Sequence, residues 1–124
     1  MKRLLLLFVL FASGAFAQSA PSVTITWPPG AGSTAANTAS FNVLNSTVSG
    51  GPYATIGNVA YVSGQSSFSF TWTGGTCNTV YFFVIEAIGP TTAPGTSLPS
   101  PQATATFPCP LPPTPGQPTI MVNP

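Results

Sequence analysis

Charged side chains are almost absent from this sequence. Its 124 residues include two basic residues, one acidic residue and no histidine. Both basic residues, Lys2 and Arg3, stand near the N-terminus, and the acidic residue is Glu86. Without cationic side chains, the rest of the chain has nothing to neutralise phosphates or to dock electrostatically on anionic lipid. We therefore expect no nucleic-acid partner and no charge-driven membrane binding.

The same shortage excludes most catalytic and metal-binding arrangements. General acid–base catalysis usually needs two titratable groups, or one beside a nucleophile, and Glu86 has no second such group. A Ser-His-Asp triad is impossible without His and Asp. Two cysteines and one glutamate do not supply the four ligands of a zinc site. We expect no enzyme activity, no cofactor and no metal.

The first 17 residues are typical of a secretory signal peptide. The two basic residues precede an apolar run over 4–11, and Ala-Phe-Ala at 15–17 is a small-x-small cleavage site. The apolar run is short for a membrane span. Gln18 stands where a lipid-anchored precursor would carry Cys. We expect a secreted, periplasmic or cell-surface protein that has left the membrane after cleavage; an uncleaved anchor is the alternative.

Helical periodicity is also missing, and apolar and polar residues alternate in short stretches instead. This alternation is the pattern of half-buried strands, and Gly, Pro, Ser and Thr punctuate it at short intervals. The predicted strands cover 23–27, 40–44, 53–62, 67–72, 79–88 and 103–107. With no helix to cover a parallel sheet, the pattern predicts an all-β fold, an antiparallel two-sheet sandwich of six to seven strands over residues 18–107.

The alternation also predicts which side chains face the core. On the strand over 79–88 it turns Glu86 toward solvent, next to a small exposed apolar patch made by Phe82 and Val84. The predicted core consists of Val23, Ile25, Trp27, Phe41, Val43, Ile56, Phe68, Phe70, Tyr81, Phe83, Ile85 and Ala87.

Several of these stretches resemble strands of a fibronectin type III domain. VTITWPP at 23–29 resembles strand B, with Trp27 in the core before a proline-rich turn. FNV at 41–43, followed by SGGPY at 49–53, resembles strand C and the turn into strand C′. TVYFFVIEA at 79–87 resembles strand F, with Tyr81 at the core tyrosine of the family, and GTSLPS at 95–100 resembles the start of strand G.

The resemblance implies an immunoglobulin-like β-sandwich in which strand A is short or missing. It also implies that strands F and G are antiparallel neighbours. Cys77 precedes strand F and Cys109 follows strand G, so a hairpin folded about residue 93 places them opposite each other. Because export leads to an oxidising compartment, we predict a Cys77–Cys109 disulfide. Two free thiols or an intermolecular bridge are the alternatives.

Residues 108–124 form a Pro-rich tail whose front part is predicted to be an extended polyproline linker. The end of the tail is apolar and strand-like, and consists of Thr119, Ile120, Met121 and Val122. Since strand A is short or missing, we hypothesise that this stretch fills the open edge beside strand B. It would do so in the same molecule or in the next one, and the second case would build head-to-tail fibres.

The sequence therefore predicts an exported, non-catalytic module for adhesion, protein binding or a structural role. Protein or carbohydrate ligands are expected at the end loops over 28–38 and 90–97. One alternative is a subunit of a surface fibre or coat assembled through the tail. Another is a carbohydrate-binding module that stacks sugars on Tyr53 or Tyr61. Asn45 begins an N-glycosylation sequon at a predicted loop edge.

Overall fold

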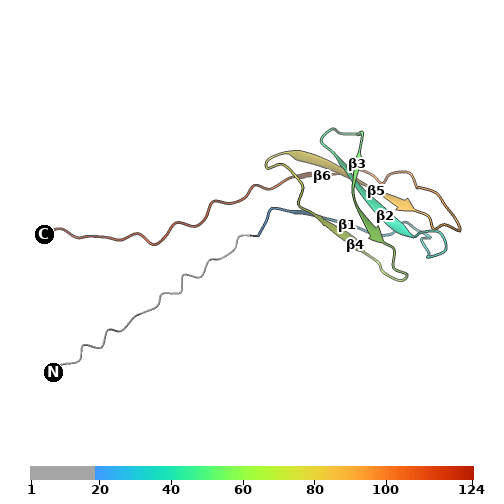
Figure 1. Cartoon of the computed structure of the whole chain (residues 1–124), viewed down its shortest axis with the longest axis horizontal. Helices are drawn as coiled ribbons and strands as arrows, with labels where there is room; N and C mark the ends of the chain where they lie inside the picture. The colour runs from blue at the N-terminus through green and yellow to red at the C-terminus, as the bar shows by residue number, and fades with distance from the viewer. Residues whose placement is uncertain (1–18) are drawn as a thin grey trace, which may run out of the picture.

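A computed structural model describes residues 19–124, so the predicted signal peptide at 1–17 lies outside the described range. The described residues contain six strands and no helix (Figure 1). None of them forms a helix of the length and apolarity that a membrane span requires. The strands are β1 (Val23–Trp27), β2 (Ser40–Ser46), β3 (Ala54–Ala60), β4 (Phe68–Trp72), β5 (Val80–Ile88) and β6 (Ala103–Thr106).

The strands form two antiparallel sheets, which confirms the predicted all-β, two-sheet sandwich. One sheet pairs β1 with β4, and the other has the strand order β3-β2-β5-β6. In the first sheet Val23 lies opposite Trp72 and Trp27 lies opposite Phe68. In the second sheet β5 is central and lies between β2 and the short strand β6.

The two ends of the sandwich differ in what they carry. At one end β1 finishes at Trp27, and the start of β2 at Ser40 pairs with Ile88 at the finish of β5. We call this the loop end, because the connections 28–39 and 89–102 leave from it. At the other end β6 leads into the tail, which runs away from the sandwich (Figure 1). We call this the tail end.

The core consists of two apolar clusters, one toward each end. The cluster at the loop end is built on Trp27, Phe41, Val43 and Phe68. The cluster at the tail end is built on Tyr81, Phe83 and Phe107. Every residue predicted for the core either belongs to one of these clusters or packs against it. Phe107, which follows β6, is an addition to the predicted set.

One glycine allows the two sheets to approach closely. Gly57 lies in β3 opposite Val43, next to a register shift in the β2–β3 ladder. A Cβ atom at position 57 would run into the ring of Phe70, which projects from β4 in the other sheet. The absence of a side chain at this position therefore brings β3 and β4 together across the core.

The tail end is fastened by several bonds around the start of β5. The Tyr81 hydroxyl accepts a hydrogen bond from the backbone N–H of Thr76 at 2.9 Å. The N–H of Asn78 donates to the carbonyl of Phe107 at 2.9 Å, and the N–H of Phe107 donates to the carbonyl of Thr79 at 2.8 Å. These bonds hold the segment after β6 against the turn before β5.

A disulfide joins Cys77 and Cys109 at the tail end. The two Cα atoms are 4.5 Å apart, and the cysteines are 32 residues apart in the sequence. The hairpin formed by β5 and β6 therefore begins and ends at a covalent link. Neither cysteine is a free thiol in this structure.

The prediction of an exposed apolar patch at Phe82 and Val84 was wrong for Val84, which is 3% exposed. Val84 pairs with Leu44 on the outer face of the four-stranded sheet. The Tyr53 hydroxyl donates a hydrogen bond to the Gln102 side-chain oxygen. Tyr53 precedes β3 and Gln102 precedes β6, so their bond spans the two central strands. We call this polar bridge the outer clasp.

Asn45 also differs from its predicted position. It lies inside β2, where it pairs with Phe83 of β5, and it is 9% exposed. A glycan needs an accessible side-chain amide, and the folded chain does not offer one here. The strand is longer than the predicted 40–44, because β2 continues alongside β5 to Ser46.

Candidate functional site

A pocket of about 690 Å³ opens at the loop end of the sandwich. It lies where β1 ends, β2 begins and β5 ends, and the connections that leave those strands complete its walls. Both predicted ligand loops, 28–38 and 90–97, contribute residues to it. The structure thus brings together two loops that are more than 50 residues apart in the sequence.

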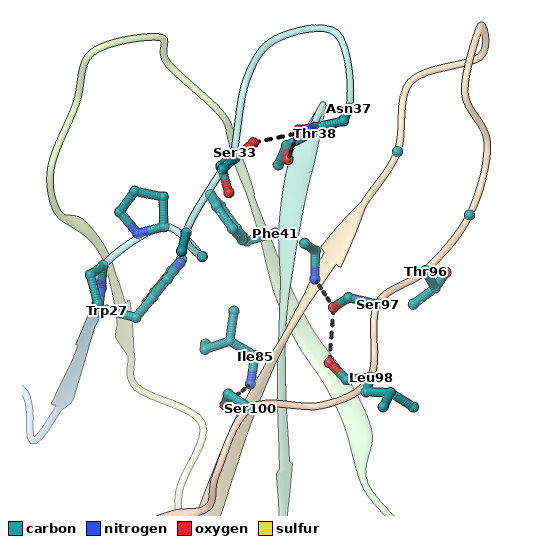
Figure 2. A pocket seen from close by; sticks show the side chains of 18 of the residues that line it. Trp27, Ser33, Asn37, Thr38, Phe41, Ile85, Thr96, Ser97, Leu98 and Ser100 are labelled. Atoms are coloured by element: carbon teal, nitrogen blue, oxygen red, sulfur yellow. Dashed lines mark hydrogen bonds between the residues drawn. The ribbon is translucent and has the colours of Figure 1, made fainter.

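Aromatic and aliphatic side chains of the core form the apolar wall of the pocket. Trp27 meets Phe41 edge to face, with ring centroids 5.7 Å apart, and stacks against Phe68 at 6.4 Å. Trp27 and Phe41 are buried, whereas Ile85 and Ala87 of β5 are half-buried and line the pocket. Figure 2 shows Trp27, Phe41 and Ile85 across the pocket from Ser97 and Leu98.

The indole nitrogen of Trp27 is a notable polar atom in this wall. It is buried and has no hydrogen-bond partner among the described residues. Trp27 as a whole is 7% exposed. An unpaired buried donor costs about 1–3 kcal/mol, so an acceptor that reached it would stabilise the complex that it formed.

The first loop keeps its shape through local hydrogen bonds. The side-chain oxygen of Asn37 accepts bonds from the Thr34 N–H and the Thr38 hydroxyl, both at 2.8 Å. The side-chain nitrogen of Asn37 donates to the Gly32 carbonyl at 3.0 Å. Gly32 has a φ of 80°, in the left-handed region that glycine adopts without strain. The loop therefore presents a formed surface to the pocket.

Two serines fasten the opposite wall to β5. The backbone N–H groups of Ser97 and Ser100 donate to the carbonyls of Ala87 and Ile85, respectively. The hydroxyls of the same serines accept bonds from the N–H groups of those same β5 residues, at 2.8 and 2.9 Å. Each hydroxyl thus replaces a backbone carbonyl in the ladder. Pro99 lies between the serines and cannot donate a ladder bond, so the segment pairs with β5 without forming a regular strand.

Leu98 lies between the two serines and is 89% exposed. It lines the pocket together with Pro101 and the proline pair at 28–29. Leu98, Ser100 and Pro101 lie outside the loops predicted to contact ligand, 28–38 and 90–97. No local signal marks them, because the bonds of Ser97 and Ser100 to β5 depend on the register between two segments 10 to 15 residues apart.

None of the residues lining the pocket is charged. Glu86, the acidic residue of the described part, pairs with Asn42 on the outer face of the sheet, away from the pocket wall formed by Ile85 and Ala87. No three His, Cys, Asp or Glu residues come together within 19–124. The site therefore offers apolar surface, hydroxyls, amides and backbone groups, which suit binding of an uncharged ligand by contact and hydrogen bonding.

The pocket adjoins an open sheet edge. Among the described strands, β1 pairs with β4 alone, so its second edge carries backbone groups without a strand partner. Such an edge accepts an added strand, which is how many proteins bind extended peptides. Because β1 ends at Trp27, a strand added to this edge would reach the pocket.

The other sequence-predicted residues lie elsewhere. Tyr61 packs against Phe41 and Phe68 at 6.2 and 5.8 Å, and its hydroxyl donates to the Ser33 carbonyl. Tyr53 is half-buried in the outer clasp. Neither ring forms the exposed platform that sugar stacking was predicted to use. Cys77 and Cys109 lie at the tail end.

The predicted strand-donor segment at 119–122 is exposed and makes no strand pairing in its own molecule. The edge of β1 is therefore open in this structure. The same-molecule version of the strand-donor hypothesis had predicted that residues 119–122 would fill it. No protein-family model matches this chain, and a search of curated proteins finds no match to it.

Proposed function

We propose that this chain is an exported, non-catalytic β-sandwich module that binds an extended, uncharged peptide at the loop end. The observation that carries the proposal is the uncharged pocket that opens where the free edge of β1 ends at Trp27. An extended peptide matches both features, because its backbone pairs with the strand edge and its apolar side chains enter the pocket. Adhesion, or a structural role outside the cell, follows from such binding.

The family resemblance is consistent with this role. The strand order β3-β2-β5-β6 opposite β1-β4 agrees with strands C′, C, F and G opposite B and E of a fibronectin type III domain without strand A. The bond between the Tyr81 hydroxyl and the Thr76 backbone resembles the tyrosine corner of such sandwiches. Export is supported by the disulfide, which requires an oxidising compartment to persist.

The test is a binding screen on the full chain produced by export. An array of uncharged heptapeptides with alternating apolar residues is compared with the same peptides carrying proline at every second position. Binding is followed by NMR at the two indole N–H signals of Trp27 and Trp72. We expect alternating peptides to shift the Trp27 signal, because Trp27 lines the pocket, while Trp72 does not line it and serves as the internal reference.

Two variants locate the binding site. Ala31→Trp places a large side chain at the mouth of the pocket, since Ala31 is exposed and lines it. Ala36→Trp makes the same change on the same loop, at an exposed position that does not line the pocket. Binding should be lost in Ala31→Trp and kept in Ala36→Trp. An array without binders, equal binding by both variants, or a glycan that alone shifts Trp27 would each contradict the proposal.

A further inference from the structure

Several groups at the pocket and the adjacent edge of β1 have no hydrogen-bond or packing partner among the described residues. The five residues of β1 have one edge with no strand partner in the described part of the chain. Trp27 ends this edge and lines the pocket, and its buried indole N–H has no acceptor among the described residues. The surrounding walls are apolar and uncharged. An occupant that fits these groups is a short strand with its own N–H groups, a free carbonyl and two or three apolar side chains.

The tail of the same chain contains such a strand. Between Pro118 and Pro124 run five consecutive residues that have backbone N–H groups, Thr-Ile-Met-Val-Asn at 119–123. This run equals β1 in length, and its β-branched residues favour the extended conformation. Elsewhere in 108–118 prolines interrupt every stretch longer than two residues, so no other part of the tail can complete a strand ladder.

These apolar residues are exposed in the structure. Ile120 is 84% exposed, Met121 82% and Val122 87%. Side chains at alternate positions point to the same face of a strand, so Ile120 and Val122 would face the sandwich together. Burying this pair would remove a large apolar surface from water, which favours an occupied state.

The geometry of the tail points to a groove on a second molecule. The tail starts at the tail end, where Cys109 is bonded to Cys77, and runs away from the sandwich (Figure 1). The Pro-rich stretch 108–118 reaches about 34 Å at about 3.1 Å per residue, and it is semi-rigid. β1 itself is about 17 Å long at about 3.3 Å per residue. If this stretch folded back, it would carry 119–123 past the edge of β1 in its own molecule.

We propose that residues 119–123 of one copy add as a strand to the free edge of β1 in a second copy and fill its pocket. This rests on the proposed function, since the pocket must first accept an extended peptide. The donor and acceptor surfaces lie at opposite ends of the molecule. Each copy can therefore give a strand at its tail end and take one at its loop end, so the contact is head-to-tail and extends into chains of copies.

The first experiment measures self-association of the full exported chain by sedimentation velocity over a range of concentrations. The double variant Ile120→Asp, Val122→Asp places two charges where the donor should enter an uncharged pocket. Its matched control is Leu111→Asp, which changes another exposed apolar residue of the tail, 75% exposed, outside the donor. The proposal expects association by the native chain and by Leu111→Asp, and association weakened by roughly tenfold or more in the double variant.

The second experiment separates this proposal from the proposed function. A synthetic peptide of residues 117–123 is added to the monomeric double variant, and the Trp27 indole signal is followed as above. The peptide should bind, and Ala31→Trp introduced into the same background should abolish binding while Ala36→Trp should not. If array peptides bind but this peptide does not, self-donation is wrong and the proposed function stands. If no peptide binds, both are wrong. Equal association by the native chain and the double variant would also overturn self-donation.

Discussion

At the scale of single residues, the packing of this domain depends on places where a side chain is absent. The ring of Phe70 packs directly against the backbone of Gly57 in β3. The ring of Phe107 packs in the same way against the backbone of Gly75, between β4 and β5. In both cases the neighbour is an aromatic ring inside or beside a core cluster. The small residue and the large ring therefore act as a pair, and neither can change alone without cost.

Gly57→Ala should destabilise the domain by about 1–3 kcal/mol, the range for over-packing a filled core. The added Cβ would collide with Phe70, and relief would require β3 and β4 to separate. Urea unfolding followed by tryptophan fluorescence measures the change. Gly30→Ala is the matched control, because its Cβ would lie 3.7 Å from the nearest atom, a Ser33 hydroxyl. Equal effects of the two substitutions would show that contact with Phe70 does not limit packing.

Gln102→Ala should destabilise the domain by about 1–2 kcal/mol. Each hydrogen bond that is lost contributes about 0.5–1.5 kcal/mol, and the three bonds of Gln102 contribute toward the lower end of that range because they are exposed to solvent. The Gln102 side chain binds the Tyr53 hydroxyl, the Gly50 N–H and the Ser49 hydroxyl. Hydrogen exchange at the Gly50 amide should accelerate. Gln65→Ala is the control, because the Gln65 side chain bonds only locally, to the Ser67 carbonyl. Unchanged Gly50 exchange would contradict the bond between the Gly50 N–H and the Gln102 side chain.

At the scale of elements, the segment after the β5–β6 turn behaves as a strand made partly from side chains. Ser97 and Ser100 each bind a β5 residue through both the backbone N–H and the hydroxyl. This lets two prolines lie near the sheet without leaving the β5 amides unpaired. It also leaves Leu98 pointing outward at the pocket.

Ser97→Ala and Ser100→Ala should each destabilise the domain by about 1 kcal/mol. Each substitution removes the acceptor of one β5 amide, that of Ala87 or Ile85, respectively. Residue-resolved hydrogen exchange should therefore show faster exchange at that one amide in each variant. Ser69→Ala on β4 is the control, since Ser69 is exposed in the structure. If the two β5 amides keep their native protection, the hydroxyls do not serve in the ladder.

Alternation along the chain predicted the strands and the inward-facing residues well, because both depend on short-range geometry. It failed at Val84, which is 3% exposed on the outer face of the sheet, because the alternation within one strand does not show which distant residues cover that face. It failed at Asn45 because the length of β2 is set by its pairing with β5. The predicted end loops do meet at the pocket. The bonds of Ser97 and Ser100 to β5, which form one wall of the pocket, could not be predicted, because they depend on the register between that segment and β5.

At the scale of the whole molecule, a single disulfide closes the β5–β6 hairpin. The double variant Cys77→Ser, Cys109→Ser should lose about 3–4 kcal/mol of stability, as the chain-entropy estimate gives for a loop of 32 residues. Urea unfolding of the variant measures this loss, and the native chain treated with a reductant should match it. A variant within 1 kcal/mol of the oxidised native chain would contradict the prediction.

The same disulfide determines how the molecule would respond to a pulling force. Tension applied between the segment before β1 and the tail would pass from Cys109 directly to Cys77, because the covalent bond joins them. The residues between the two cysteines include all of β5 and β6, and they would carry no load. A stretched, oxidised molecule should therefore extend by about 100 Å less than a reduced one, at about 3.4 Å per sequestered residue. Reduction of the disulfide would therefore lengthen the stretched molecule by releasing the segment between Cys77 and Cys109.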